Sequence, residues 1–274
     1  MRLVTYQRNG LARSGVVLGG DVFDTGFATT RAALEAGAIE AGERVGALDE
    51  LELGAPITDP DKIVCLGLNY RDHAAESGLA LPAAPMLFAK FRNSLTGPAS
   101  PIVLPGVGSQ FDYEAELAIV IGRRGKAIAA EDALEHVAGA MAFNDVTARD
   151  IQHATSQWMA GKAIDTFAPC GPALVTLDEL GDLQDLAIRA RVNGETVQDG
   201  HTSQMIFGVA ETIAFVSRLM TLEVGDIIAT GTPAGVGISR SPQVLLGDGD
   251  VVEVEIEGLG VLANRVAALV AVES

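Results

Sequence analysis

The hydrophobic pattern of the chain is that of many short strands. Short apolar runs, most of them ended by Gly, Pro or Asn, recur between residues 62 and 266. Examples are KIVCLGL (62–68), PMLFAKF (85–91), VAGAMAFND (137–145), AIRARVNGETVQ (187–198) and VVEVEIEG (251–258). The Asn193-Gly194 pair predicts a tight hairpin. Only short helices are predicted there, around residues 70–77, 130–136, 148–155 and 208–219. This pattern favours a β-rich α+β fold, a barrel or rolled sheet, over a doubly wound fold.

The first 58 residues follow a different pattern. RLVTY, SGVVLGG and DVFDT are short β segments, and TTRAALEAGAIEAG (29–42) predicts a helix with Thr29 or Thr30 at its N-cap. The segment LGAPITDPDK (53–62) carries two prolines and several turn residues. We therefore expect a small N-terminal domain over residues 1–58 and a larger domain over residues 59–274, with the boundary near Asp59.

Composition excludes several classes of function. The formal net charge of −17 predicts repulsion from nucleic acid and from anionic membrane surfaces. No apolar run is long enough to span a bilayer, and MRLVTYQRNG lacks the apolar region of a signal peptide. Two cysteines do not make a disulfide framework. We expect a cytoplasmic protein that binds neither nucleic acid nor membranes.

Carboxylates gather where two predicted strands enter the core. Read as one strand, FDYEAELAIVIG (111–122) places Asp112, Glu114 and Glu116 on one face, and Asp145 ends the apolar strand VAGAMAFND. Like charges repel, and burial strengthens the repulsion. A hard divalent cation with oxygen ligands would neutralise Glu114, Glu116 and Asp145. The alternative is a solvated edge that carries acids.

Three further features are compatible with catalysis. In GLNYRDHAAESG (67–78), His73 and Glu76 share a helix face, so the carboxylate can orient the imidazole as a general base. Lys162, between Gly and Ala, is a candidate to stabilise an oxyanion. The loop ATGTPAGVG (229–237) exposes backbone N–H groups and the Thr232 hydroxyl to a ligand. The alternatives are a surface pair, a solvated lysine and a plain turn.

Taken together and in order, these segments resemble the fumarylacetoacetate hydrolase family. The resemblance runs from about Asp59 to the C-terminus, through GLNYRDHAAE, PMLFAKF, FDYEAELAIVIG, FNDVTARDIQ, GKAIDTFAPCGP, TGTPAGVG and GDGDVVEVEIEGLGVLANRV. It is closest to the small prokaryotic-type members, which include acylpyruvases, fumarylpyruvate hydrolases and 2-hydroxyhepta-2,4-diene-1,7-dioate isomerases. The implied fold is a mixed β-roll or barrel with short helices and a small N-terminal β-containing domain. A homodimer is implied as well.

The resemblance also implies roles for individual residues. These are metal ligation by Glu114, Glu116 and Asp145, catalysis by His73, Glu76 and Lys162, and substrate contacts by Arg149, Gln152, Thr232 and Lys90. The implied metal is Mg²⁺ or Mn²⁺, with Ca²⁺ also compatible with three carboxylates. The implied reaction is hydrolysis of the C3–C4 bond of a 2,4-dioxo acid, of acylpyruvate or fumarylpyruvate type, to pyruvate and a carboxylic acid. Isomerisation of a 2-hydroxy-dienedioate and decarboxylation of oxaloacetate remain alternatives, because the same enolate chemistry serves all three.

Overall fold

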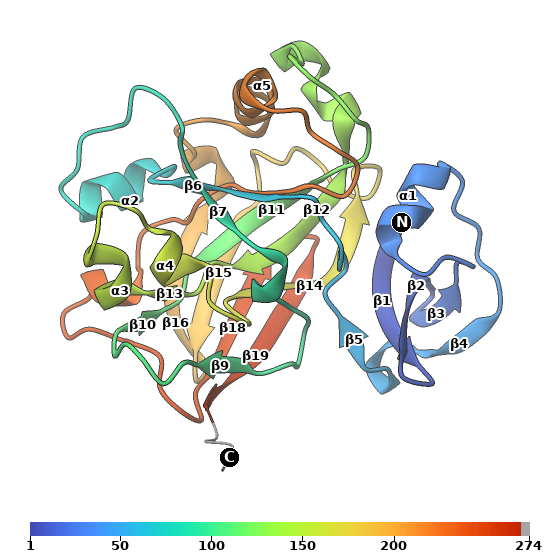
Figure 1. The fold of residues 1–274 in the computed structure, drawn as a ribbon, viewed down its shortest axis with the longest axis horizontal. Helices are drawn as coiled ribbons and strands as arrows, with labels where there is room; N and C mark the ends of the chain where they lie inside the picture. Colours follow the sequence, from blue (N-terminus) through green and yellow to red (C-terminus); the bar gives the residue numbers. More distant parts are fainter. Residues whose placement is uncertain (270–274) are drawn as a thin grey trace.

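A large mixed sheet runs through the molecule. The computed structural model describes residues 1–269, and Figure 1 shows its course. In spatial order the main strands are β4 (Arg44–Ala47), β3 (Asp21–Asp24), β2 (Leu11–Leu18), β1 (Arg2–Arg8), β14 (Ala168–Thr176), β12 (Val137–Asn144), β11 (Ala115–Ile121), β17 (Ile227–Ala229), β6 (Ile63–Gly67) and β7 (Met86–Lys90). In addition, β5 (Leu53–Gly54) pairs with β1 and β8 (Leu95–Thr96) pairs with β14. β11, buried along its whole length, lies between β12 and β17.

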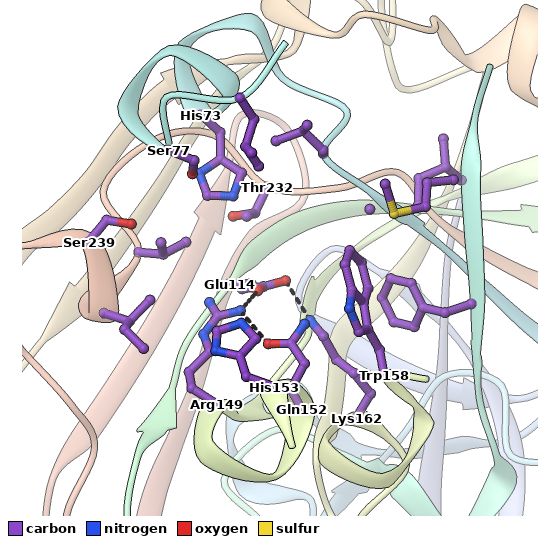
Figure 2. Close-up of a pocket in the computed structure, with 18 residues that line it drawn as sticks. His73, Ser77, Glu114, Arg149, Gln152, His153, Trp158, Lys162, Thr232 and Ser239 are labelled. Carbon is purple, nitrogen blue, oxygen red and sulfur yellow. Dashed lines mark hydrogen bonds and ion pairs between the residues drawn. The ribbon is translucent and has the colours of Figure 1, made fainter. Parts of the chain in front are cut away.

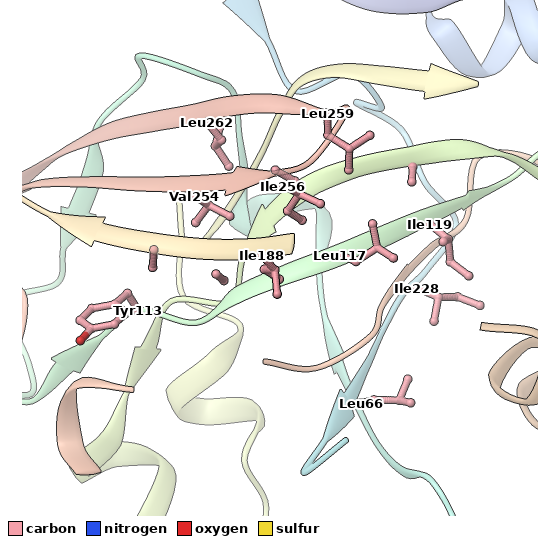
Figure 3. Packing of buried hydrophobic residues seen from close by; sticks show 14 of the residues in the cluster. Leu66, Tyr113, Leu117, Ile119, Ile188, Ile228, Val254, Ile256, Leu259 and Leu262 are labelled. Atoms are coloured by element: carbon pink, nitrogen blue, oxygen red, sulfur yellow. The ribbon is translucent and has the colours of Figure 1, made fainter. Parts of the chain in front are cut away.

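A second sheet packs against the first. Its order is β16 (Glu195–His201), β15 (Ala187–Val192), β18 (Val251–Ile256), β19 (Gly260–Ala268) and β9 (Ile102–Leu104). Buried and partly exposed residues alternate along β15 and β18, as expected for strands with one apolar face. In Figure 3, Ile188 and Ile256 of this sheet belong to the same core cluster as Leu117 and Ile119 of β11. Asn193 and Gly194 form the predicted hairpin turn, both with positive φ.

The helices are short, as predicted. They are α1 (Thr30–Ala36), α2 (Arg71–Glu76), α3 (Arg149–His153), α4 (Met159–Lys162) and α5 (Val209–Leu219), with 3-10 segments η1 (Leu48–Glu50), η2 (Arg92–Ser94), η3 (Ala130–His136), η4 (Thr202–Gln204) and η5 (Gly237–Ser239). The predictions around residues 70–77, 148–155 and 208–219 are confirmed, whereas residues 130–136 form 3-10 turns. Thr29 caps α1, since its hydroxyl accepts a hydrogen bond from Ala32 N at 3.1 Å. Within residues 1–269, no helix is long and apolar enough to cross a membrane.

The N-terminal segment has a small core but also extends the main sheet. Val4, Tyr6 and Val22 pack together with Ala173 of β14. β1 pairs antiparallel with β14 through Arg2 and Leu3. Figure 1 shows these elements, in blue, beside the remaining chain. The domain boundary near Asp59 stays a prediction.

The predicted single strand over residues 111–122 is interrupted. β10 (Phe111–Asp112) pairs with β13 (Thr147–Ala148), and β11 starts only at Ala115. At the break, Glu114 N donates to Asn144 Oδ1 at 3.0 Å, and Asp145 N donates to Glu114 O at 2.9 Å. The expectation of one continuous strand is therefore wrong at Tyr113 and Glu114, although Asp112 and Glu114 still contact the same guanidinium group, that of Arg149.

Candidate active site

The antiparallel pairing of β11 and β12 brings three acids together. Glu114 precedes β11, Glu116 lies within it, and Asp145 follows β12. One carboxylate oxygen from each lies within 4.8 Å of the other two, and all three residues are buried. The sequence prediction that these carboxylates converge is thereby confirmed.

Glu116 is the least compensated member of this acid cluster. Its Oε2 accepts a hydrogen bond from Gly231 N at 2.9 Å, whereas its buried Oε1 has no hydrogen-bond partner within residues 1–269. Burial, and then the charges of Asp145 and Glu114, raise the pKa of Glu116 well above its usual value. Buried oxygen ligands with unmet charge fit a hard divalent cation such as Mg²⁺, Mn²⁺ or Ca²⁺.

Two lysines neutralise part of the cluster. Lys162 Nζ, at the end of α4, lies 2.9 Å from Glu114 Oε2 and 2.7 Å from Asp145 Oδ2. Burial opposes the charge of Lys162, but Asp145 and Glu114 outweigh it and raise the pKa of the ammonium group. Lys90 Nζ lies 2.7 Å from Asp145 Oδ1. The alternative of a solvated Lys162 is thus wrong, because its side chain is only 2% exposed.

Lys90 is fully buried, and backbone carbonyl groups surround its ammonium group in addition to Asp145. Its ammonium group also donates to the carbonyl oxygens of Val146 at 2.9 Å, Phe167 at 2.7 Å and Lys162. Burial lowers its pKa, and its side chain is fully buried. Its predicted contact with a substrate carboxylate stays a prediction that this arrangement does not favour.

A cavity of about 370 Å³ opens beside the cluster. Figure 2 shows that Glu114, Arg149, Gln152 and Lys162 lie on one side of it and His73 on the other. Arg149 Nη1 lies 2.7 Å from Glu114 Oε1 and donates to Gln152 Oε1 at 3.2 Å. Two residues predicted to contact substrate therefore meet at the cavity wall.

The predicted His73–Glu76 pair is present at the opposite wall. His73 Nδ1 lies 3.2 Å from Glu76 Oε2 on α2, and both side chains are partly buried. Glu76 Oε1 accepts a hydrogen bond from Gly235 N at 2.9 Å, which holds the carboxylate in place. An imidazole oriented by a carboxylate and facing a cavity has the arrangement of a general base.

Thr232 also lines the cavity, but its hydroxyl is engaged. It donates to Ala115 O at 2.8 Å and accepts a hydrogen bond from Gln198 Nε2 at 2.8 Å. Gln198 comes from β16 in the second sheet, and sequence reasoning missed it. The predicted contact of Thr232 with substrate stays a prediction.

Sequence reasoning also missed an aromatic wall of the cavity, formed by Trp158 and Phe88. Trp158, the single tryptophan of the chain, packs edge-on against Phe88 with ring centroids 5.6 Å apart. A Cβ at Gly67 would lie 2.5 Å from the Trp158 ring, so glycine leaves room for the indole. The position of this tryptophan a few residues before Lys162 was the available signal. The contact itself depends on β6 and β7, which lie far away in sequence.

The fold agrees with the comparisons to known proteins. The family model for the fumarylacetoacetate (FAA) hydrolase C-terminal domain matches residues 62–267, and the chain belongs to this family. The predicted family and its β-rich α+β fold are thereby confirmed.

Relatives from this family carry different reaction names. The chain is 50% identical over 219 residues to human oxaloacetate tautomerase FAHD2A, mitochondrial, covering 79% of this chain and 70% of the relative. The solved fumarylacetoacetate hydrolase from Exiguobacterium antarcticum is 41% identical, with a TM-score of 0.90 over 98% of this chain and 100% of that one. The 2-hydroxyhepta-2,4-diene-1,7-dioate isomerase from Mycobacterium marinum is 36% identical, with a TM-score of 0.79 over 98% of each chain.

Proposed function

We propose that the protein is an enzyme that interconverts the enol and keto forms of a small 2-oxo acid of oxaloacetate type, with a divalent cation held by Glu114, Glu116 and Asp145. The observation that carries the proposal is the buried acid cluster, which opens on a cavity with Arg149 beside it and His73 opposite. Sequence reasoning placed C–C hydrolysis first. We place tautomerisation first because a relative at 50% identity is named as an oxaloacetate tautomerase.

The bound cation, Mg²⁺ or Mn²⁺, would supply Lewis acidity next to the 2-oxo group and the neighbouring carboxylate. Arg149 and Gln152 would bind the substrate carboxylate at the cavity wall. Conversion of enol to keto removes the proton of the 2-hydroxyl and adds one proton to C3, so no bond between heavy atoms breaks. His73, oriented through Nδ1 by Glu76, would move this proton through its other ring nitrogen. Lys162 would stabilise negative charge on the substrate oxygen.

Hydrolysis of an acylpyruvate or fumarylpyruvate is the second candidate. The observation that favours it is the His73–Glu76 pair, since an oriented imidazole is the base needed to activate water. Water would add to the C4 carbonyl carbon, and the C3–C4 bond would break to leave pyruvate and a carboxylic acid. Isomerisation of a 2-hydroxy-dienedioate or decarboxylation of oxaloacetate uses the same enolate chemistry and the same residues.

One panel of assays separates these reactions. Enol absorbance of oxaloacetate and release of pyruvate are followed with oxaloacetate, acetylpyruvate and fumarylpyruvate, each with Mg²⁺ or Mn²⁺ and with excess chelator. We expect chelator-sensitive loss of the oxaloacetate enol without pyruvate release. Pyruvate with the matching carboxylic acid from a diketo acid would instead establish the hydrolase. Pyruvate from oxaloacetate alone would establish the decarboxylase, and no change with any substrate would contradict the proposal.

The expected surroundings of the enzyme are proposals too. A homodimer and a cytoplasmic location rest on sequence reasoning alone, and the human relative is named as mitochondrial. We expect this protein to bind the small 2-oxo acid, and neither nucleic acid nor a membrane.

A further inference from the structure

Asp112 is a buried acid that the proposed chemistry does not use. It begins the carboxylate row of the sequence, is fully buried, and is not one of the three acids of the cluster. Its Oδ1 accepts hydrogen bonds from Tyr113 N at 2.9 Å and Gly237 N at 2.7 Å. Its Oδ2 accepts from Ile238 N at 3.1 Å and from Arg149 Nε at 2.8 Å. One carboxylate thus holds two separate walls of the cavity.

The first wall is the loop that ends in η5. A Cβ at Gly237 would lie 2.6 Å from Asp112 Oδ1 and 2.0 Å from Val244 O, so glycine permits this close approach. Ile238, which donates to Asp112, lines the cavity. The same loop donates from Gly235 N to the Glu76 carboxylate, which orients His73. Asp112 therefore holds the same loop that holds the Glu76 carboxylate, and Glu76 orients His73, the proposed base.

The second wall is the guanidinium group of Arg149. Nε is held by Asp112 and Nη1 by Glu114 and Gln152, whereas the buried Nη2 has no hydrogen-bond partner within residues 1–269. Although burial opposes the charge, Glu114 and Asp112 raise the pKa of Arg149, so the cation persists. Arg149 lines the cavity, so an unpartnered donor on its guanidinium group is suited to an incoming anion.

We propose that Asp112 is a positioning residue: it fixes Arg149 and the loop of residues 235–239 relative to each other, so that the guanidinium group is held where it can bind a substrate carboxylate. The proposal rests on the proposed function for the nature of the substrate. Without Asp112, the guanidinium keeps only its contacts to Glu114 and Gln152, and rotation about its side-chain bonds displaces Nη2. A displacement of about 1 Å at such a group costs about 100-fold in rate.

The test compares Asp112→Asn with Asp150→Asn in the metal-loaded protein. Asparagine keeps the volume, but its NH₂ group would face the donors Arg149 Nε and Ile238 N. Asp150 follows Arg149 in α3 but accepts its hydrogen bonds from Ser109 and Ile151, so its variant is a matched loss of charge. Quenching of the single tryptophan, Trp158 at the cavity wall, reports binding of oxalate, a small probe with the oxygen pattern of a 2-oxo acid.

For Asp112→Asn we expect weaker oxalate binding by about 10- to 100-fold and a matching rise in KM. The metal concentration that gives half of the maximal rise in melting temperature should stay the same. Asp150→Asn should bind oxalate as wild type does. A lower melting temperature with unchanged oxalate affinity would show a purely structural role and overturn the proposal. Asp112→Ser, which is smaller and keeps one acceptor, gives the same comparison if the asparagine variant does not fold.

A double-mutant cycle with Arg149→Lys tests whether Asp112 affects oxalate binding through Arg149. If Asp112 acts through Arg149, Asp112→Asn adds almost nothing to the loss of oxalate affinity in the Arg149→Lys background. Additive losses would overturn the proposal. Oxalate binding without turnover of any 2-oxo acid would contradict only the proposed function, whereas wild-type protein that binds no oxalate would contradict both.

Discussion

Replacement of Glu116 by Gln tests the acid cluster as a metal site. Glu116 is fully buried, its Oε1 has no partner within the described chain, and its carboxylate is repelled by Asp145 and Glu114. Glutamine keeps an oxygen for the Gly231 N–H group and removes the buried charge. The metal-free variant should therefore be at least as stable as metal-free wild type, while binding of the cation should be lost.

The size of the effect follows from mass action. A cation at 100 times its Kd stabilises the folded protein by about 2.7 kcal/mol. In a protein of this size, each kcal/mol raises Tm by about 2–4 °C, so wild type should gain about 5–10 °C. Thermal unfolding with Mg²⁺, with Mn²⁺ and with excess chelator measures this shift. Glu131→Gln, at an exposed glutamate in η3, is the control and should keep the full shift.

Two results would refute this reasoning. A metal-induced shift of wild-type size in Glu116→Gln would place the cation elsewhere. A clear drop in Tm of the metal-free variant would mean that the Glu116 charge is compensated in the folded protein, contrary to its unpartnered oxygen and raised pKa.

Three further predictions concern separate parts of the molecule. His73→Ala should lower kcat by about 100- to 10,000-fold and leave the metal-induced Tm shift unchanged, because the role proposed for the imidazole is proton transfer and the acid cluster does not include it; survival of turnover would contradict this role. Gly67→Ala should displace Trp158, whose ring would lie 2.5 Å from the new Cβ, and an unchanged tryptophan emission spectrum would contradict this packing. Hydrogen bonding to Arg13 lowers the pKa of Asp24 from 3.8 to about 2. Above about pH 4, the free energy of unfolding measured in urea should therefore be about 1–2 kcal/mol larger for wild type than for Asp24→Asn. This difference should shrink as pH falls below about 4 and vanish only below about pH 2, where the folded carboxyl becomes protonated; a difference independent of pH would contradict the ion pair.

The local sequence pattern was sufficient to predict most strands and helices and the types of reactive residue. The short strands, the hairpin at Asn193-Gly194 and the helix that carries His73 and Glu76 were predictable, because side-chain periodicity and turn chemistry act over a few residues. The convergence of Glu114, Glu116 and Asp145 was predictable from acids at the ends of two apolar strands. The interruption at Tyr113 and Glu114 was not, because it depends on hydrogen bonds to the neighbouring strand.

The sequence by itself determined which chemical groups are present and on which kinds of element they lie. Only the tertiary structure decided which charges meet. Lys90 pairs with Asp145, and Asp112 pairs with Arg149, 37 residues away in the sequence. The physical reason is that a buried charge must find its counter-charge wherever the packed sheets place one. That partner is set by the three-dimensional contacts of distant strands and is not encoded in the local pattern.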